Sequence, residues 1–248
     1  MLQIKYRKQS NAYFCKMKVL ITGATSGIGK AIALHLAHLG CKIIFPARNS
    51  EKAKALIAQL SKINDTVHDW RMCDITEEIT LKAFNDYVQK QHGTPDVIIN
   101  NAGVYDFGAV LESSEEQLET MLDQNFRHAY RISQYWMPYL KEIKKGTIIF
   151  IGSQVTKELR TGAAAYTMSK GLLEFYAKLV AEEMRDANVG VTRIVPGSVN
   201  TPSWGDMDVP KSTFVQSEDI ALAVEQVIRM KPGTWVEEII IRTKDRKW

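Results

Sequence analysis

The 248-residue sequence has no apolar run long enough to cross a membrane, no low-complexity tract and no internal repeat. These absences argue against a membrane protein, a disordered chain and a repeat array. The three cysteines, Cys15, Cys41 and Cys73, are odd in number and match no metal-ligand spacing. We therefore expect free thiols in a reducing compartment and no metal site. The sequence predicts a soluble, cytoplasmic protein.

Acidic residues are missing from the first 50 positions, which contain eight Lys or Arg, although the whole chain has a net charge of only +4. Such asymmetry can indicate nucleic-acid binding. Aromatic residues are not interleaved with the basic ones on a defined element, so we expect no nucleic-acid partner. Residues 1–16 also lack the apolar centre of a signal peptide. We expect them to form a poorly ordered leader, with a short organelle-targeting segment as the alternative.

What the sequence does contain, from Met17 onward, is an alternation of short β-branched runs with longer segments of helical periodicity. This alternation is typical of a parallel sheet covered by helices on both faces, the doubly wound α/β or Rossmann fold. With 45% apolar residues, positions 17–248 suit a single domain better than two small ones. The expected strands, about seven, are residues 18–22, 42–46, 67–72, 96–100, 147–152, 190–195 and 235–242.

Local signals place several ends of these elements. Ser114 and Gln117 match a capping box at the start of a long helix to about residue 139, whose last turn Pro138 should perturb. Ser217, followed by two acids, indicates another helix start. Pro46 has no N–H to donate, so the second strand should stop pairing there.

Three glycines, Gly23, Gly27 and Gly29, lie between the first expected strand and the helix that follows it. Gly23 permits a tight turn, while the other two let backbone approach a pyrophosphate and let helix pack on strand. The N–H groups at the helix start favour an anion. An acid ending the second strand would bind a ribose 2′-hydroxyl, but Ala47 and Arg48 stand there instead. We therefore expect NADP(H) rather than NAD(H). A solvated loop arginine is the alternative interpretation of Arg48.

Tyr166 and Lys170 are four residues apart, about one helical turn, so the phenol and the ammonium project from the same face. A phenol titrates near ~10 in water and must lie beside positive charge to exchange protons at neutral pH. Lys170 supplies that charge, and Ser153 adds a second hydroxyl at the end of the fifth expected strand. Each residue alone is better explained by core packing, capping or solvation. Together they favour an oxidoreductase that moves a hydride with a nicotinamide cofactor.

The chain resembles the short-chain dehydrogenase/reductase family from Met17 to about residue 243. The likeness rests on motifs that occur in the family's order. They are the glycine motif at 22–29, Asn-Asn-Ala-Gly at 100–103, the quartet Asn125, Ser153, Tyr166 and Lys170, and Pro196-Gly197 with Thr201 beyond it.

The resemblance implies that Tyr166 is the acid/base, that Ser153 orients the substrate oxygen, and that Lys170 holds the nicotinamide ribose and lowers the pKa of the phenol. Asn125 would support a water-linked proton relay to Lys170. The implied cofactor contacts include Asp74 on the adenine amino group, Asn101 and Gly103 near the adenosine ribose, and Val199 and Thr201 near the carboxamide. The remaining implied contacts are Gly23, Thr25, Ser26, Gly27, Ile28, Gly29, Arg48, Ala102, Tyr166, Lys170, Pro196 and Gly197.

A substrate would be surrounded by three loops, 104–109, 154–165 and 198–214. Lys157 and Arg160 could bind a carboxylate there, or could be solvated loop charges. The short segment after Pro196 leaves room only for a small lid, so we expect a small carbonyl compound or alcohol. Four side chains could form an apolar wall or belong to the core: Tyr105, Phe107, Trp204 and Met207.

Two helices should keep apolar outer faces, and large exposed patches usually associate symmetrically. By resemblance we expect a homodimer or homotetramer. Two other functions are compatible with the fold: a dinucleotide sensor or scaffold without turnover, and an epimerase or dehydratase. The intact quartet argues against the first, and the short chain after Gly197 against the second. The faces contain Met121, Tyr135 and Trp136 on one helix, and Leu172, Phe175, Tyr176, Leu179 and Met184 on the other.

Overall fold

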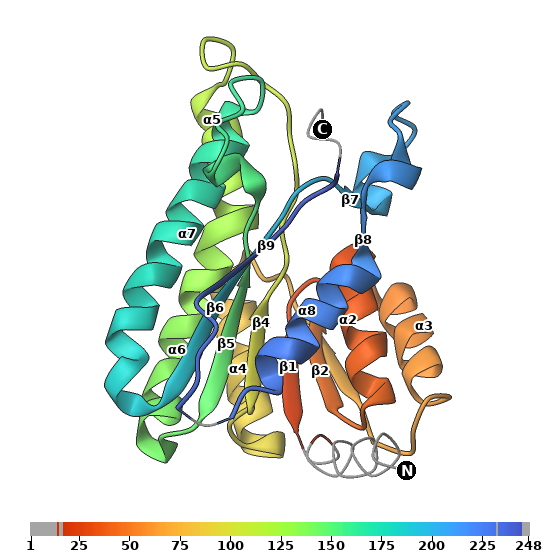
Figure 1. Ribbon diagram of the computed structural model, residues 1–248. Coiled ribbons are helices and arrows are strands. Elements are labelled where there is room, and N and C mark those ends of the chain that lie inside the picture. The colour runs from red at the N-terminus through yellow and green to blue at the C-terminus, as the bar shows by residue number, and fades with distance from the viewer. Residues whose placement is uncertain (1–13, 15–16, 232, 245–248) are drawn as a thin grey trace.

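The computed structural model describes residue 14 and residues 17–231 and 233–244. Its main sheet has seven parallel strands in the order β3-β2-β1-β4-β5-β6-β9 (Figure 1). Every strand expected from the sequence is present, and the ends differ from the predicted ones by a few residues. The strands are β1 (Lys18–Ile21), β2 (Lys42–Ala47), β3 (Asp69–Met72), β4 (Val97–Asn100), β5 (Gly146–Ile151), β6 (Val189–Pro196) and β9 (Glu238–Ile241).

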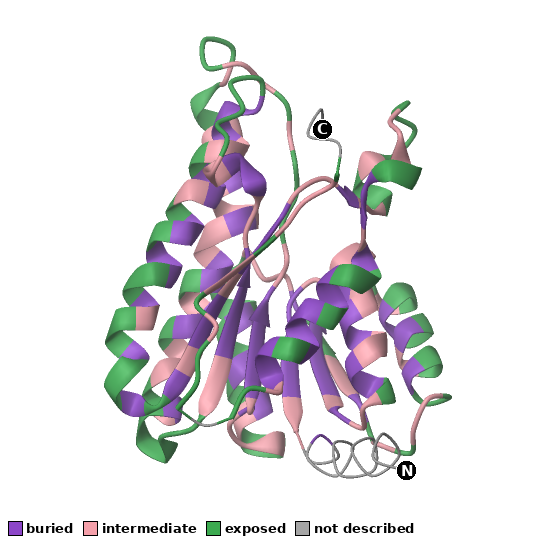
Figure 2. Cartoon of the chain, viewed as in Figure 1, coloured by how far each residue is buried: buried purple, intermediate pink, exposed green. Residues whose placement is uncertain are grey.

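Helices cover both faces of this sheet, as predicted. One core packs α2 (Gly27–His38), α3 (Ser50–Leu60) and α8 (Ser217–Ile228) on the sheet, and the other packs α4 (Glu78–His92), α6 (His128–Ile143) and α7 (Ala164–Met184). Successive residues of β1 point to opposite faces, since Val19 and Ile21 belong to the first core and Leu20 to the second. Figure 2 shows the buried sheet between helices that are exposed on their outer sides.

The prediction that β2 stops pairing at Pro46 is wrong for one of its two neighbours. Pairing with β1 ends at Ile44, but pairing with β3 continues through Pro46 to Ala47. Proline removes a donor from only one edge of a strand, so the ladder on the other edge survives.

The long helix expected after Ser114 is interrupted. α5 (Glu115–Leu122) is followed by a π-helical turn, Asp123–Arg127, before α6 begins. The Ser114 hydroxyl caps α5 by accepting from the backbone N–H of Gln117, as predicted. The Gln117 side chain does not complete the capping box, because its amide donates to Asp106 and to the carbonyl of Phe107.

α6 also runs past Pro138 to Ile143, so the predicted end near residue 139 is wrong. Trp136 and Leu140, which flank the proline, are fully buried and hold this turn against the sheet. The helix start predicted at Ser217 is confirmed, and Gln216 with Asp219 forms its capping box.

Phe14 is the described residue of the expected leader, and the poor order expected of residues 1–16 stays a prediction. Its side chain is fully buried, and the Arg229 guanidinium lies 4.6 Å from the centre of its ring. The other residues of 1–16 lie outside the described residues. Within the described part of the chain, no helix combines the length and apolar character needed to span a membrane.

Candidate active site

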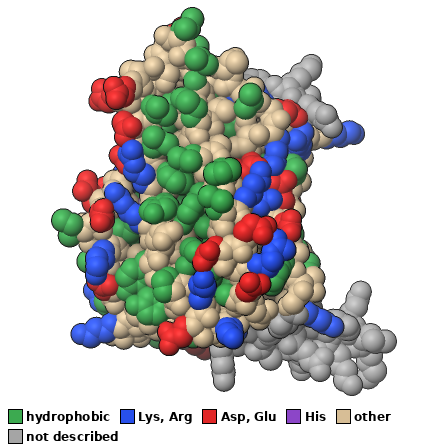
Figure 3. Space-filling view, turned by 90° about the vertical axis from the view of Figure 1, so that its left-hand side faces the viewer, with side chains coloured by type: hydrophobic (Ala, Val, Ile, Leu, Met, Phe, Trp, Pro, Cys, Tyr) green, Lys and Arg blue, Asp and Glu red, His purple; other side chains and the backbone are tan. Residues whose placement is uncertain are grey.

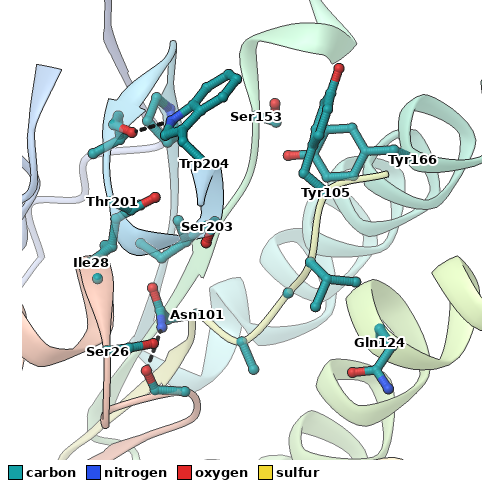
Figure 4. Close-up of a pocket in the computed structure, with 18 of the residues that line it drawn as sticks. Ser26, Ile28, Asn101, Tyr105, Gln124, Ser153, Tyr166, Thr201, Ser203 and Trp204 are labelled. Carbon is teal, nitrogen blue, oxygen red and sulfur yellow. Dashed lines mark hydrogen bonds between the residues drawn. The ribbon is translucent and has the colours of Figure 1, made fainter. Parts of the chain in front are cut away.

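A cleft of about 850 Å³ lies at the carboxyl ends of the strands, where the strand order reverses between β1 and β4. In Figure 4, Ser26 and Ile28 of the glycine turn lie at one end of this cleft, and Ser153 and Tyr166 lie at the other. The structure brings most of the predicted site residues together here. Those that line the cleft are Gly23, Thr25, Ser26, Gly27, Ile28, Arg48, Asn101, Ala102, Gly103, Ser153, Tyr166, Lys170, Pro196, Gly197, Val199 and Thr201.

Thr22 joins the glycine turn to the loop after β4. Its hydroxyl accepts the backbone N–H groups of Asn101 and Ala102, each at 3.0 Å, and the Asn101 amide donates to the Thr22 carbonyl at 2.9 Å. A Cβ at Gly29 would collide with the Gly23 carbonyl, so α2 can begin this close to the turn only with glycine. These bonds therefore join the glycine motif at 22–29 to the Asn-Asn-Ala-Gly motif at 100–103, although the two are far apart in the sequence.

The start of α2 fits an anion. Its first turn holds no acidic residue, and in the described structure the Ser26 side chain makes no capping hydrogen bond. The first N–H groups of the helix are thus left without a side-chain cap, and the helix dipole favours negative charge beside them. A dinucleotide pyrophosphate fits this position.

Arg48 and Lys52 line the end of the cleft beside β2. Arg48 Nη1 lies 3.7 Å from Asp74 Oδ2, an exposed pair that holds the guanidinium weakly. Sequence reasoning missed Lys52, although its place four residues after Arg48 was a usable signal. Gln124, a further lining residue, had no such signal, whereas Gln154 and Ser203 lie in two of the loops expected to surround a substrate.

Asp74 is not among the described residues that line the cleft, so its predicted contact with adenine stays a prediction. Its Oδ1 accepts the backbone N–H and the hydroxyl of Thr76, at 3.0 and 2.8 Å. Burial alone would raise the pKa of this carboxyl, but the bonds from Thr76 and the charge of Arg48 outweigh it and hold the pKa below its usual range.

The Tyr166 hydroxyl points into the cleft beside Ser153 (Figure 4). Burial raises the pKa of Tyr166 to about 12, and the opposing effect is a hydrogen bond with Ser153. Tyr166 is therefore a protonated donor at neutral pH. Lys170 is not among the groups that shift the pKa of this phenol in the structure, so the expected lowering by Lys170 stays a prediction.

Lys170 is 4% exposed, and its ammonium donates to the Ile151 carbonyl at 3.1 Å. Burial lowers the pKa of this ammonium to about 8. Gly103 makes room for it, since a Cβ there would lie 3.2 Å from Lys170 Nζ and 2.7 Å from Asn125 Oδ1. Because Gly103 has no side chain, Lys170 Nζ and Asn125 Oδ1 can both lie close to its backbone.

Asn125 is fully buried behind the cleft, in the π-helical turn. Its Oδ1 accepts the Val104 N–H at 2.8 Å, and its Nδ2 donates to the Ser169 hydroxyl at 3.0 Å. The side chain therefore ties the loop after β4 to α7. π-Helical turns are rare and often occur at functional sites.

Aromatic residues from two of the three predicted loops wall the other side of the cleft. The Tyr105 ring lies 4.7 Å from Tyr166, 4.9 Å from Phe107 and 6.1 Å from Trp204, measured between ring centres. The Trp204 indole is fixed by donating to the Val199 carbonyl at 2.8 Å. These rings and Met207 line the cleft, as the apolar-wall interpretation predicts.

The two basic residues of loop 154–165, Lys157 and Arg160, have different surroundings. Lys157 Nζ lies 2.8 Å from Glu174 Oε1 and 2.9 Å from Glu238 Oε1, so its charge is neutralised inside the protein. Lys178 Nζ also lies 2.7 Å from Glu174 Oε1. Burial would raise the pKa of Glu174, but bonds from the lysines lower it to about 2. Arg160, in contrast, lines the cleft.

Comparisons with known proteins show the family of this chain. A family model described as short chain dehydrogenase matches residues 17–210. A sepiapterin reductase of Chlorobaculum tepidum is 30% identical over 239 residues, which cover 90% of this chain and 95% of the relative. An NADPH-dependent pterin aldehyde reductase of Arabidopsis thaliana is 30% identical over 193 residues, or 77% of this chain and 78% of the relative.

Solved structures show the same likeness. An alcohol dehydrogenase from the archaeon Thermococcus sibiricus, complexed with 5-hydroxy-NADP, has a TM-score of 0.85 at 25% identity and covers 92% of this chain and 97% of its own. A metagenomic short-chain oxidoreductase in complex with NADP has a TM-score of 0.80 at 28% identity, with 93% and 98% covered. The chain therefore belongs to the short-chain dehydrogenase family of oxidoreductases.

Proposed function

We propose that the protein is an NADP(H)-dependent oxidoreductase that interconverts a carbonyl and an alcohol on a small molecule, with Tyr166 as the acid/base. The observation that carries this proposal is that Tyr166 and Ser153 line the same cleft, with the Ser153 hydroxyl close enough to the Tyr166 phenol to influence its pKa. Two such donors converge on a single carbonyl oxygen, which is the geometry that proton transfer to that oxygen needs.

The residues that would hold the cofactor follow the cleft from end to end. The start of α2 suits the pyrophosphate, and Arg48 with Lys52 suits a 2′-phosphate in a region where Ala47 offers no carboxylate. Lys170 suits the ribose beside the reacting centre. A bound nicotinamide would supply or accept the hydride. Two of the similar structures carry NADP or its 5-hydroxy form, and this supports the choice of phosphate-bearing cofactor.

The protein's own part of the reaction is to position an oxygen and to move a proton. Ser153 orients the carbonyl oxygen, and Tyr166 Oη donates its proton as negative charge develops there. A phenol with a pKa of about 12 is protonated at neutral pH and can give this proton in reduction of a carbonyl, while its phenolate would take the proton back in oxidation of an alcohol. Two relatives are named as reductases, one of them for an aldehyde.

A second copy of the chain is the partner that we propose for the outer face of α7. Hydrophobic side chains gather on this side of the molecule (Figure 3). The prediction of this face from the sequence was half correct, because Met121, Trp136, Tyr176 and Met184 point inward and are buried. The exposed members along α7 are Met168, Leu172, Phe175 and Leu179. The size of the oligomer and the cytoplasmic location stay predictions.

The test is consumption of NADPH with a panel of aldehydes and ketones, including pterin carbonyl compounds. Absorbance of the reduced nicotinamide is followed while the alcohol product is identified. Turnover with matched formation of alcohol supports the proposal. Tight binding of NADPH without turnover in either direction across the panel would overturn it and favour a nucleotide sensor.

A further inference from the structure

The basic side chains that line the cleft are more numerous than the proposed cofactor accounts for. The described lining contains Arg48, Lys52, Arg160 and Lys170, with Asp208 as its acid. Arg48 and Lys52 lie at the nucleotide end, and Lys170 is buried beside the reacting centre. Arg160 lies in loop 154–165, one of the loops expected around a substrate, so we assign it no part of the cofactor.

Arg160 is anchored by its backbone and open at its side chain. Its carbonyl accepts the Ala163 N–H at 3.2 Å and the Thr167 hydroxyl at 3.3 Å, so its position is tied to the first turn of α7. Its side chain is exposed, and within residues 17–231 and 233–244 no ion pair or hydrogen bond engages the guanidinium. Lys157, in the same loop, is held by two carboxylates. Only one of these two cations is available to a ligand.

Tyr105 connects Arg160 to the reacting centre. Burial raises the pKa of the Tyr105 phenol and the nearby charge of Arg160 opposes that rise, so the guanidinium lies within electrostatic reach of the phenol. The same ring lies 4.7 Å from the Tyr166 ring. Arg160 therefore lines the same cleft as the rings of Tyr105, Trp204 and Tyr166, with Tyr105 between the influence of the guanidinium and the proton donor.

We propose that Arg160 is the specificity-determining residue for an anionic group, so that the preferred substrates are aromatic carbonyl compounds with a carboxylate across the ring from the carbonyl. This proposal rests on the proposed function. A guanidinium matches a carboxylate with two parallel hydrogen bonds, and the apolar walls strengthen that attraction. The substrate ring lies against Tyr105 while its carbonyl lies between Ser153 and Tyr166.

The first test compares 4-formylbenzoate with 4-formylbenzamide, which has nearly the same shape without the charge. Arg160→Gln is expected to lower kcat/KM for the acid by about tenfold or more and to leave the amide within about twofold. Arg185→Gln, which removes an exposed arginine after the far end of α7, is the matched control and should change neither substrate. Equal losses on both aldehydes would overturn the proposal and show that Arg160 orders its loop or pairs with Asp208.

A charge reversal gives a second test. Arg160→Glu is expected to prefer (4-formylphenyl)trimethylammonium over 4-formylbenzoate, which reverses the preference of the wild type. An unchanged preference would overturn the proposal.

Calorimetry separates this proposal from the function on which it rests. If the wild type consumes neither these aldehydes nor any other compound of the carbonyl panel, the proposed function fails. Binding of 4-(hydroxymethyl)benzoate and of its amide in the presence of NADP⁺ then decides the role of Arg160 by itself. Tighter binding of the acid that disappears in Arg160→Gln supports the role, and equal binding of the two compounds refutes it.

Discussion

Two charged groups lie one helical turn apart on α7 and differ in how their charge is neutralised. Lys170 faces the cleft with one backbone carbonyl as its recorded acceptor, and burial lowers its pKa to about 8. Glu174 lies behind the cleft, where Lys157 and Lys178 hold its pKa at about 2 against the effect of burial. A buried charge that lacks a counter-ion marks a place for a ligand, whereas one with two counter-ions serves the scaffold.

The comparison predicts that substitutions at the cleft and at the ion network damage different properties. The largest effect is expected from Tyr166→Phe, which keeps the ring and removes the proton donor. It should lower kcat/KM by roughly 10³-fold and leave the thermal unfolding midpoint almost unchanged. Steady-state kinetics and thermal unfolding measure the two. Tyr105→Phe, the neighbouring phenol in the cleft, is the control and should keep most activity. More than a tenth of wild-type activity in Tyr166→Phe would contradict the assignment.

Glu174→Gln should instead lower stability and leave activity almost unchanged. We expect a loss of about 3 kcal/mol in the free energy of unfolding at pH 7. The folded pKa, about 2, is below the ordinary value of 4.5. The stabilisation is therefore complete above pH 4.5 and is lost as pH falls toward 2. Urea unfolding from pH 7 to pH 2.5 should show the variant and the wild type converging in acid. Glu183 is also on α7 and forms an exposed pair with Lys141 of α6, so Glu183→Gln should have little effect at any pH. A constant difference across this pH range would rule out the ion network as the cause.

Lys170→Met should lower activity strongly but stabilise the nucleotide-free protein, by about 2 kcal/mol at pH 7. Burial lowers the pKa of this ammonium from 10.5 to about 8. The cost of burying the charge is therefore fully present below pH 8 and disappears as pH rises to 10.5. Loss of the bond to the Ile151 carbonyl offsets part of the gain. Lys178→Met on the same helix should destabilise instead, because it removes a partner of Glu174. Chemical denaturation measures the change in the free energy of unfolding for each variant. If both variants were stabilised or both destabilised, the predicted difference between the two lysines would be wrong.

The smallest effect is expected from Arg48→Ala at the exposed nucleotide end. Affinity for NADPH should fall about tenfold while affinity for NADH changes little, since only the former has a 2′-phosphate. Fluorescence titration with each nucleotide measures this. Arg71→Ala, which removes a guanidinium stacked 3.8 Å from the centre of the Tyr87 ring, is the control for loss of a nearby positive charge. Equal losses for the two nucleotides would contradict the role of Arg48.

The fold was largely predictable because strands buried on both faces appear in the sequence as apolar runs, as the first three residues of Val97–Asn100 do. The failures at Pro46 and Pro138 share one cause, since neighbours distant in sequence held elements that local rules would end. The glycine turn and the Tyr166–Lys170 pair were predictable because each is local.

The rest of the site depends on contacts between distant segments. Tyr166 is enclosed by Tyr105 of another loop, so its raised pKa has no local signature. Lys157 is neutralised by Glu238, which lies 81 residues away, so sequence alone could not separate it from Arg160. Charge type is visible in a sequence, but charge compensation is a property of the folded chain.

The π-helical turn at Asp123–Arg127 makes the position of Asn125 depend on the number of residues in the helix. A π turn is equivalent to one residue inserted into an α-helix, and one residue corresponds to a rotation of about 100°. Deleting a single residue from this turn would give a more regular helix. It would also rotate the residues on the amino-terminal side of the deletion about the helix axis. The link from the Val104 loop to α7 would then be lost through a change in phase, although no side chain in the cleft had been altered.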